Sequence, residues 1–294
     1  MADARSPTVR RRELGALLRE MRQEAGLTVQ QVAGRLLVAP SSISRLETGQ
    51  RGASLRDIRD LCDLYGVTDA AVRERLNGLA REGRRQAWWQ GYDLPYATYV
   101  GLEAEAVAIS DFEPGVVPGL LQTPEYSRAL HEAAMPRLSP AGIDQRVETR
   151  RNRQAILTRT DSPPPRLHAI LDESVLRRVV GSPAVMAAQL DRLTALCELP
   201  NVTVQVLGYG AGAHPALDST FILLYFAPPV PAVVYVEGLL GQKYLDQAAD
   251  VERYEGVFGR LRELALDPQA SLSLIASVRA AYQGGGGITA VQRQ

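Results

Sequence analysis

Residues 28–51, TVQQVAGRLLVAPSSISRLETGQR, decide the fold of the N-terminal part of this chain. A first short helix is predicted because four apolar side chains repeat at the spacing of one helix face: Val29, Val32, Ala33 and Leu36. Thr28 begins this helix, and Gln31 three residues later completes a capping box that satisfies two N–H groups. Pro40 begins a second helix, at a position where its missing N–H costs nothing.

The second helix turns Ile43 and Leu46 inward, which leaves Ser41, Ser44 and Arg45 facing outward. Helices shorter than ~12–15 residues are marginal in water, so this pair needs neighbours. Three flanking stretches supply apolar residues on a helical period: 14–21, 55–65 and 72–79. The sequence therefore predicts a compact bundle of five helices that contains a helix-turn-helix. The second helix of such a motif is shaped to enter a DNA major groove.

The run LGALLREMRQEAGLTVQQVAGRL, followed by PSSISRLETGQR and SLRDIRDLCDLYGV, resembles the λ-repressor-like (Xre) DNA-binding domain over residues 13–67. The resemblance implies contacts to base edges from four residues: Pro40, Ser41, Ser44 and Arg45. It implies contacts to phosphates from five others: Thr28, Gln30, Ser42, Thr48 and Arg51. In this family an arginine late in the first helix pairs with a glutamate that ends the recognition helix. We therefore expect a structural ion pair between Arg22 and Glu47.

Three positions depart from the usual pattern of that family. Val29 stands where many relatives carry a glutamine that touches phosphate, so this contact is expected to be lost. Leu37 occupies a turn position that is often glycine. Ala39 replaces the usual serine cap, a loss of ~1 kcal/mol. These departures are expected to weaken the local geometry without abolishing it.

The charge of the chain is unevenly distributed, although its formal net charge is zero. Residues 1–90 carry 16 arginines against 11 acidic residues, a net charge of +5, and the remainder carries −5. A basic module on an acidic body fits a protein that touches phosphate with one end only. Arg10, Arg11 and Arg12 are expected before the first helix, where they either reach a neighbouring phosphate or are simply solvated.

Length and cysteine usage bound the class of protein. With 294 residues, two domains are expected rather than one. Cys62 and Cys197 lie on apolar faces of separate predicted helices, which favours free thiols in a reducing compartment. The sequence shows neither a signal-peptide pattern nor ~18 consecutive apolar residues, so we expect a cytoplasmic protein without membrane association.

The expected organisation has four parts. Residues 1–85 form the helix-turn-helix DNA-binding domain, and residues 86–98 form a linker that contains Trp88 and Trp89. The two tryptophans either pack one domain on the other or anchor a ligand or an interface. Residues 99–283 form a C-terminal domain for partner binding, effector binding or dimerisation, and residues 284–294 form a flexible tail.

The C-terminal domain is predicted to be α/β, which makes the chain α+β overall. Helices are expected over residues 96–111, 124–134, 141–159, 173–180, 183–199, 246–265 and 271–282. A small sheet of about four strands is expected from residues 167–171, 201–207, 219–226 and 232–237. One predicted helix carries Arg146, Arg150 and Arg153 at helical spacing, either to pair with carboxylates of its own domain or to recognise an acidic partner.

The sequence offers no catalytic signature, so we do not expect an enzyme. No nucleophile elbow, P-loop or dinucleotide fingerprint is present, and the three histidines lack a metal-ligand pattern, so no metal or cofactor is expected. The stretch GYGAGAHPALDS, residues 208–219, comes nearest to a ligand site and offers His214 and Asp218. The alternative interpretation of this stretch is an ordinary connection between strands.

The later part of the chain also resembles known regulators. YVGLEAEAVAISDFEPGVVPGLLQTPEYSRAL, LHAILDESVLRRVVG and AGAHPALDSTFILL resemble the C-terminal domain attached to Xre modules in actinobacterial antitoxin-like or developmental regulators, over residues 96–282. Together the two resemblances imply a transcriptional regulator that binds double-stranded DNA as a homodimer, on an inverted repeat. The alternatives are an antitoxin-like protein that binds a small protein encoded nearby, and a regulator gated by a small molecule.

Overall fold

The computed structural model describes residues 6–85, 96–135, 137–239 and 241–283. The chain divides into two compact units, and each is described by itself. The first comprises residues 1–106 with 226–232, and the second comprises residues 107–225 with 233–294. Over the described residues, no helix combines the length and the apolar character that a membrane span requires.

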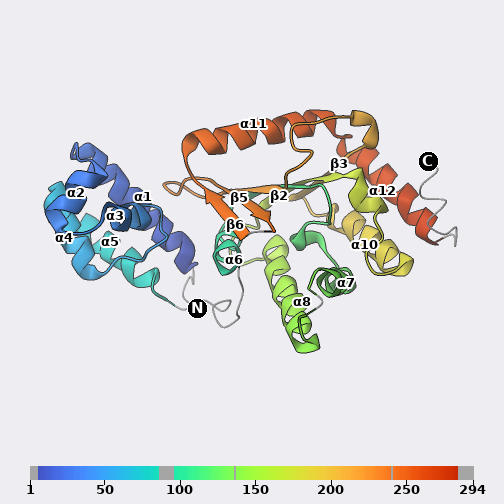
Figure 1. Ribbon diagram of the computed structural model, residues 1–294, viewed down its shortest axis with the longest axis horizontal. Helices are drawn as coiled ribbons and strands as arrows, with labels where there is room; N and C mark the ends of the chain where they lie inside the picture. The colour runs from blue at the N-terminus through green and yellow to red at the C-terminus, as the bar shows by residue number, and fades with distance from the viewer. Residues whose placement is uncertain (1–5, 86–95, 136, 240, 284–294) are drawn as a thin grey trace. The chain divides into compact units, whose positions relative to one another are not determined.

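The first unit is built from helices (Figure 1). Their bounds are α1 Pro7–Glu24, α2 Val29–Leu36, α3 Pro40–Glu47, α4 Leu55–Tyr65, α5 Ala70–Glu82 and α6 Ala97–Glu103. The capping box expected at Thr28 is present, because its hydroxyl accepts from the Gln31 N–H while the Gln31 side chain accepts from the Thr28 N–H. Ser54 and Asp57 form a second capping box at α4. Polar side chains therefore fix where both helices begin.

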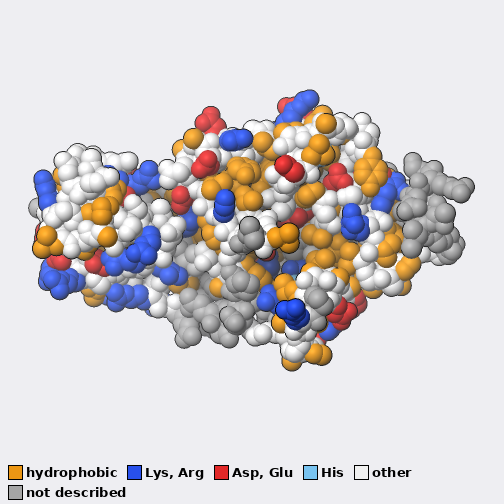
Figure 2. Space-filling model, in the orientation of Figure 1, with side chains coloured by type: hydrophobic (Ala, Val, Ile, Leu, Met, Phe, Trp, Pro, Cys, Tyr) orange, Lys and Arg blue, Asp and Glu red, His pale blue; other side chains and the backbone are white. Residues whose placement is uncertain are grey.

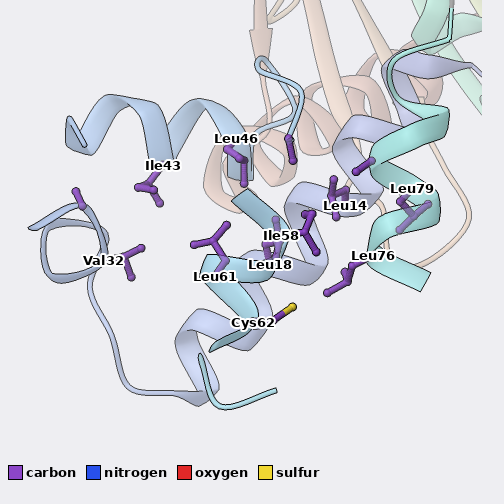
Figure 3. Close-up of a cluster of buried hydrophobic side chains, with 13 residues drawn as sticks. Leu14, Leu18, Val32, Ile43, Leu46, Ile58, Leu61, Cys62, Leu76 and Leu79 are labelled. Carbon is purple, nitrogen blue, oxygen red and sulfur yellow. The ribbon is translucent and has the colours of Figure 1, made fainter. Parts of the chain in front are cut away.

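A single apolar core holds α1 to α5 together (Figure 3). α2 contributes Val32 and Ala33 to it, and the other four helices contribute buried leucines and isoleucines: Leu14, Leu18, Ile43, Leu46, Ile58, Leu61, Leu76 and Leu79. Burying one such side chain contributes about 1.5–3 kcal/mol. Such packing, rather than intrinsic propensity, supplies most of the stability of helices this short. The packing of α2 on α3, and of α3 on α1, therefore determines their orientation.

Gly15 allows α1 to approach the end of α3 closely. A Cβ atom at this position would lie 2.4 Å from the carbonyl oxygen of Glu47 and 2.6 Å from that of Leu46. These contacts are too short for any side chain, and the atoms in the way are backbone. The absence of a side chain at Gly15 therefore sets the distance between α1 and α3.

The arginine run near the N-terminus lies inside α1, and its expected place before the first helix is wrong. Pro7 begins this helix, because proline is favoured at a first helical position. Arg12 is only 6% exposed, and Arg10 pairs with Glu13 and with Glu82 of α5. These guanidinium groups stabilise the unit and are not a solvated tail.

The second unit contains a mixed sheet of six strands among the described residues, rather than about four. The strands are β1 Ala108–Glu113, β2 Arg166–Asp172, β3 Val202–Leu207, β4 Phe221–Tyr225, β5 Val233–Gly238 and β6 Gly241–Leu245. Their order is β3-β2-β1-β4-β5-β6. β1 pairs in parallel with β2, and β2 with β3, whereas β4, β5 and β6 are antiparallel. Phe112 of β1 lies opposite Phe221 of β4 in this register.

Two of these strands, β1 and β6, have no clear strand pattern in the sequence. The helix expected over residues 96–111 ends at Glu103, and the remainder of that stretch enters β1. The two large apolar residues of β1, Ile109 and Phe112, are three positions apart, which is the spacing of a helix face rather than of a strand. β6 is an edge strand of sequence GQKYL, and its polar composition gives no apolar run to detect.

Helices cover the two faces of this sheet (Figure 1). They are α7 Pro124–Ala134, α8 Pro140–Gln154, α9 Glu173–Arg177, α10 Pro183–Leu196, α11 Ala248–Leu264 and α12 Pro268–Gln283. α11 crosses one face, where its Phe258 packs edge-on against His168 of β2 and Phe221 of β4. α7 and α8 lie on the opposite side in Figure 1.

Candidate nucleic-acid interface

The turn between α2 and α3 depends on Leu37, which has a left-handed backbone with φ 55° and ψ 40°. This conformation closes α2, because the N–H of Val38 donates to the Ala33 carbonyl at 3.0 Å. The leucine side chain is 93% exposed and thus gains no burial in return. Ala39 offers no side-chain cap to α3, and Pro40 follows it as the first helical residue. Leu37 therefore adds backbone strain to the turn, and Ala39 leaves α3 without a side-chain cap.

We expect Leu37→Gly to stabilise the first unit by about 1 kcal/mol, because glycine adopts a positive φ without the steric penalty of a Cβ atom. Thermal unfolding followed by far-UV circular dichroism measures the change. Leu37→Ala is the matched control, since it removes the same exposed apolar surface but keeps the Cβ atom. Equal melting temperatures for the two variants would contradict the assignment of backbone strain.

α3 presents its polar face to solvent while its apolar face is held in the core. Ile43 and Leu46 are buried. The outward residues named from the sequence are exposed: Pro40, Ser41, Ser44 and Arg45. The Arg45 Nε atom donates to the Ser41 carbonyl at 3.3 Å, and Arg45 forms no ion pair among the described residues. The end of its guanidinium group is therefore available to a partner outside the chain.

The residues expected at phosphates differ in how freely they can bind. The Thr28 hydroxyl accepts the cap hydrogen bond of α2, and the Thr48 hydroxyl donates to the Ser44 carbonyl at 2.9 Å. Both hydroxyls are therefore engaged within the chain. Gln30 is exposed at the start of α2, whereas Ser42 is half-buried.

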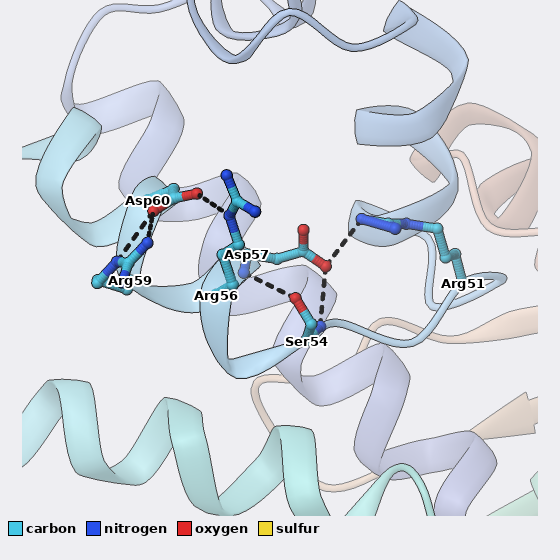
Figure 4. Close-up of polar contacts among 6 residues, drawn as sticks. All are labelled: Arg51, Ser54, Arg56, Asp57, Arg59 and Asp60. Carbon is cyan, nitrogen blue, oxygen red and sulfur yellow. Dashed lines mark hydrogen bonds and ion pairs between the residues drawn. The ribbon is translucent and has the colours of Figure 1, made fainter.

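Arg51 is held by a carboxylate of α4 (Figure 4). Its Nη2 atom lies 3.0 Å from Asp57 Oδ2, and the Arg51 side chain is 40% exposed. The same Asp57 oxygen accepts the backbone N–H of Ser54 at 2.8 Å. Ser54 and Asp57 stand at capping-box spacing in the sequence, but no sequence signal links Arg51 to a carboxylate six residues later across a turn.

Arg22 and Glu47 form the ion pair that the family resemblance implies. Arg22 Nε and Nη2 lie 2.6 and 3.0 Å from the two carboxylate oxygens of Glu47, and both residues are 9% exposed. Arg22 Nη1 also donates to the Leu27 carbonyl at 2.7 Å. The hydrogen bond with Glu47 raises the pKa of Arg22 above its ordinary value. The pair links the end of α1 to the end of α3 and to the turn before α2.

Basic side chains gather on the face of the N-terminal helices that Figure 2 shows. Some of this charge is neutralised locally, because Arg56 and Arg59 of α4 both pair with Asp60 (Figure 4). Arg45 lacks such a partner among the described residues. The positive charge of Arg45 is therefore not neutralised by a carboxylate in the described part of the chain, in contrast to the charges of Arg56 and Arg59.

The candidate ligand residues of the second unit do not form a site together. The His214 ring packs edge-on against Phe112 with ring centroids 5.7 Å apart, and its Nδ1 accepts the Ala216 N–H at 3.3 Å. Asp218 is exposed and accepts a hydrogen bond from the Ser219 hydroxyl at 3.4 Å. Trp88 and Trp89 lie outside the described residues. His214 thus orders its own loop.

The arginine-bearing face of α8 lies near carboxylates of its own unit. Glu113 accepts a hydrogen bond from the Thr220 hydroxyl at 2.9 Å. The pKa of Glu113 is raised to about 7, chiefly by burial and also by the charge of Glu237, while the hydrogen bond from Thr220 and the charge of Arg150 act in the opposite direction. Arg150 also donates to the side chain of Gln122. These contacts favour pairing within the domain, one of the two interpretations offered for this face.

Comparison with known proteins adds to this geometry. Residues 96–277 match a family described as a domain of unknown function (DUF5753). The chain belongs to this family. Residues 13–76 match a helix-turn-helix domain. Over 70 residues the chain is 36% identical to the HTH-type transcriptional regulator DdrOP3 of Deinococcus deserti, which covers 24% of this chain and 52% of that relative.

The chain therefore spans about half the length of the curated relative that it matches. No solved structure matches it. The helix-turn-helix match and the name of this relative support a DNA-binding regulator. The family of the second unit assigns no activity to it.

Proposed function

We propose that this chain is a sequence-specific transcriptional regulator of the Xre type, which reads the major groove with α3. One observation carries the proposal: α3 keeps Ile43 and Leu46 in the core while Ser41, Ser44 and Arg45 face solvent on a helix fixed at both ends. The turn with Leu37 fixes its start, and the pair of Arg22 with Glu47 fixes its end.

In this proposal the outward residues of α3 read bases. Arg45 donates two hydrogen bonds to a guanine, the commonest specific contact in a major groove. Ser41 and Ser44 add hydrogen bonds that adapt to either partner of a base pair, and Pro40 contributes an apolar contact. Since the guanidinium group of Arg45 meets no carboxylate among the described residues, no internal ion pair has to break when it binds DNA.

Phosphate contacts fix the position of the protein on the duplex in this proposal. Gln30 and the backbone N–H groups at the start of α2 bind one phosphate, supported by the helix dipole. Ser42, Thr48 and Arg51 bind the backbone from the other side of α3. The Thr28 hydroxyl only accepts in the cap, so it still has a proton to donate to a phosphate. The N–H and the hydroxyl of Thr48 both donate to the Ser44 carbonyl, so Thr48 contributes less than Arg51.

One recognition helix covers only a few base pairs, so the proposal includes a homodimer on an inverted repeat. Its half-sites are spaced by about one helical turn, ~34 Å. The second unit provides dimerisation or regulation in this arrangement. Its domain family leaves this role open, and the structure offers a cavity for a ligand there.

We expect Arg45→Ala to weaken binding to the specific DNA site by about 1–3 kcal/mol while leaving non-specific binding nearly unchanged. The operator is first obtained by selecting bound fragments from random duplex DNA, and affinities are then titrated at one salt concentration. Arg59→Ala is the matched control, because it removes the same charge from α4, where Asp60 already pairs with it. Equal losses for both variants, or no loss for Arg45→Ala, would contradict base reading by α3.

A further inference from the structure

A cavity of about 290 Å³ lies in the second unit, where the loop before β4 meets β6 and α11. The loop contributes Ser219, β4 contributes Phe221, and α11 contributes Asp250, Arg253, Tyr254 and Val257. At about 30 Å³ per water molecule this volume equals roughly ten waters, close to the lower limit for small-molecule sites. The cavity therefore suits a compact metabolite rather than a peptide or a nucleotide.

One wall of the cavity is aromatic and rigid. Phe221 is 1% exposed, and its ring meets the Tyr254 ring at 5.0 Å between centroids and an angle of 64°. Phe112 and Phe258 hold Phe221 from two further sides, with ring centroids 5.9 and 6.5 Å away. Because these contacts fix the two rings, the wall is in place before a ligand arrives, which lowers the entropic cost of binding.

Two opposite charges stand on the α11 side of the same cavity. Asp250 and Arg253 are three residues apart on α11, and both line the cavity. Among the described residues neither side chain forms a hydrogen bond or an ion pair, not even with the other. Elsewhere on α11 the same spacing produces an ion pair, between Arg260 and Glu263 at 2.9 Å. The charges of Asp250 and Arg253 are thus separated and accessible from one cavity.

We propose that this cavity binds a small zwitterion with an apolar or aromatic side chain, that is, an α-amino acid or a close analogue. The ligand carboxylate pairs with Arg253, and its ammonium group pairs with Asp250. The side chain of the ligand packs against Phe221, Tyr254 and the apolar residues of the wall. This site is independent of the DNA-binding proposal, because it lies wholly within the second unit.

The test is calorimetric titration of the full-length protein with L-phenylalanine and L-leucine. The matched probes are 3-phenylpropionate, which lacks the ammonium group, and phenethylamine, which lacks the carboxylate. We expect at least one amino acid to bind. Each probe that lacks one charge is expected to bind at least about tenfold more weakly than that amino acid, since each charged hydrogen bond contributes about this factor. Val257→Phe, which fills the cavity, is expected to abolish binding.

Two substitutions assign the charges. Arg253→Gln is expected to weaken amino-acid binding about tenfold or more without changing the affinity for phenethylamine. Asp250→Asn is expected to weaken amino-acid binding by a similar factor without changing the affinity for 3-phenylpropionate. Arg260→Gln is the control, because this arginine lies on α11 outside the cavity. Failure of both amino acids to bind at about 10 mM, a limit near −2.7 kcal/mol, would overturn the proposal. Binding that survives Arg253→Gln, Asp250→Asn and Val257→Phe unchanged would overturn it equally.

Discussion

Arg22→Met is expected to lower the free energy of unfolding of the N-terminal helices by about 3–5 kcal/mol, because it leaves the Glu47 carboxylate buried without its partner. Glu47 is 9% exposed, and both of its oxygens accept hydrogen bonds from Arg22. The substitution also removes the hydrogen bond to the Leu27 carbonyl. Hydrogen exchange of the amides in α3 and α4, measured in the full-length protein, reports the loss for this unit alone.

The double variant Arg22→Met with Glu47→Leu separates the pair from the packing around it. Replacing both charges with apolar groups of similar size is often neutral or stabilising, so we expect it to recover most of the loss. A single variant that costs less than about 1 kcal/mol would show that water replaces the missing partner. A double variant as unstable as the single one would place the cost in packing rather than in the unpaired charge.

Gly15→Ala is expected to destabilise the same helices by about 3 kcal/mol, at the upper end of the usual cost of overpacking. The new methyl group would lie 2.4 Å from the Glu47 carbonyl oxygen, so α1 and α3 must move apart. Such a movement also strains the pair between Arg22 and Glu47. Because α3 carries the proposed base contacts, we expect DNA affinity to fall together with stability in this variant.

Gly78→Ala is the matched control for this prediction. Gly78 lies within α5, and a Cβ atom there meets nothing within 4 Å. Alanine in a helix interior is favoured over glycine by about 0.5–1 kcal/mol, so this variant should be more stable than the parent chain. Chemical denaturation of both variants distinguishes a contact effect from a helix-propensity effect. Stabilisation by Gly15→Ala would mean that α1 and α3 lie farther apart than the structure shows.

The helices around α3 could be predicted because their signals are local. Apolar spacing, the capping boxes at Thr28 and Ser54, and Pro40 at a helix start each act within one or two turns of chain. The sheet was harder to predict, since strand pairing joins distant residues. β1 shows this clearly, because its neighbours β2 and β4, which pair with its two edges, follow it by more than fifty residues.

The candidate sites divide in the same way. Exposure of Arg45 follows from helix geometry once Ile43 and Leu46 are known to face inward, so sequence was sufficient there. The cavity of the second unit could not be found this way. Asp250 and Arg253 look like ordinary surface residues of an amphipathic helix, and only the fold brings Ser219 and Phe221 beside them. The glycine-rich sequence before β4 drew attention to this loop, but the residues predicted from it, His214 and Asp218, are not among those that line the cavity.

The double task of Asp57 has a consequence for how the regulator would respond to ionic strength. A DNA phosphate that binds Arg51 competes with the Asp57 carboxylate. When Asp57 loses its contact with Arg51, it still accepts the hydrogen bond from the Ser54 N–H at the start of α4. Exchange of one anion for another displaces fewer condensed cations than a contact from an unpaired arginine would. In the proposed complex Asp57 would therefore act as an internal counterion of Arg51, and the dependence of DNA affinity on salt concentration would underestimate the number of arginines at the DNA backbone.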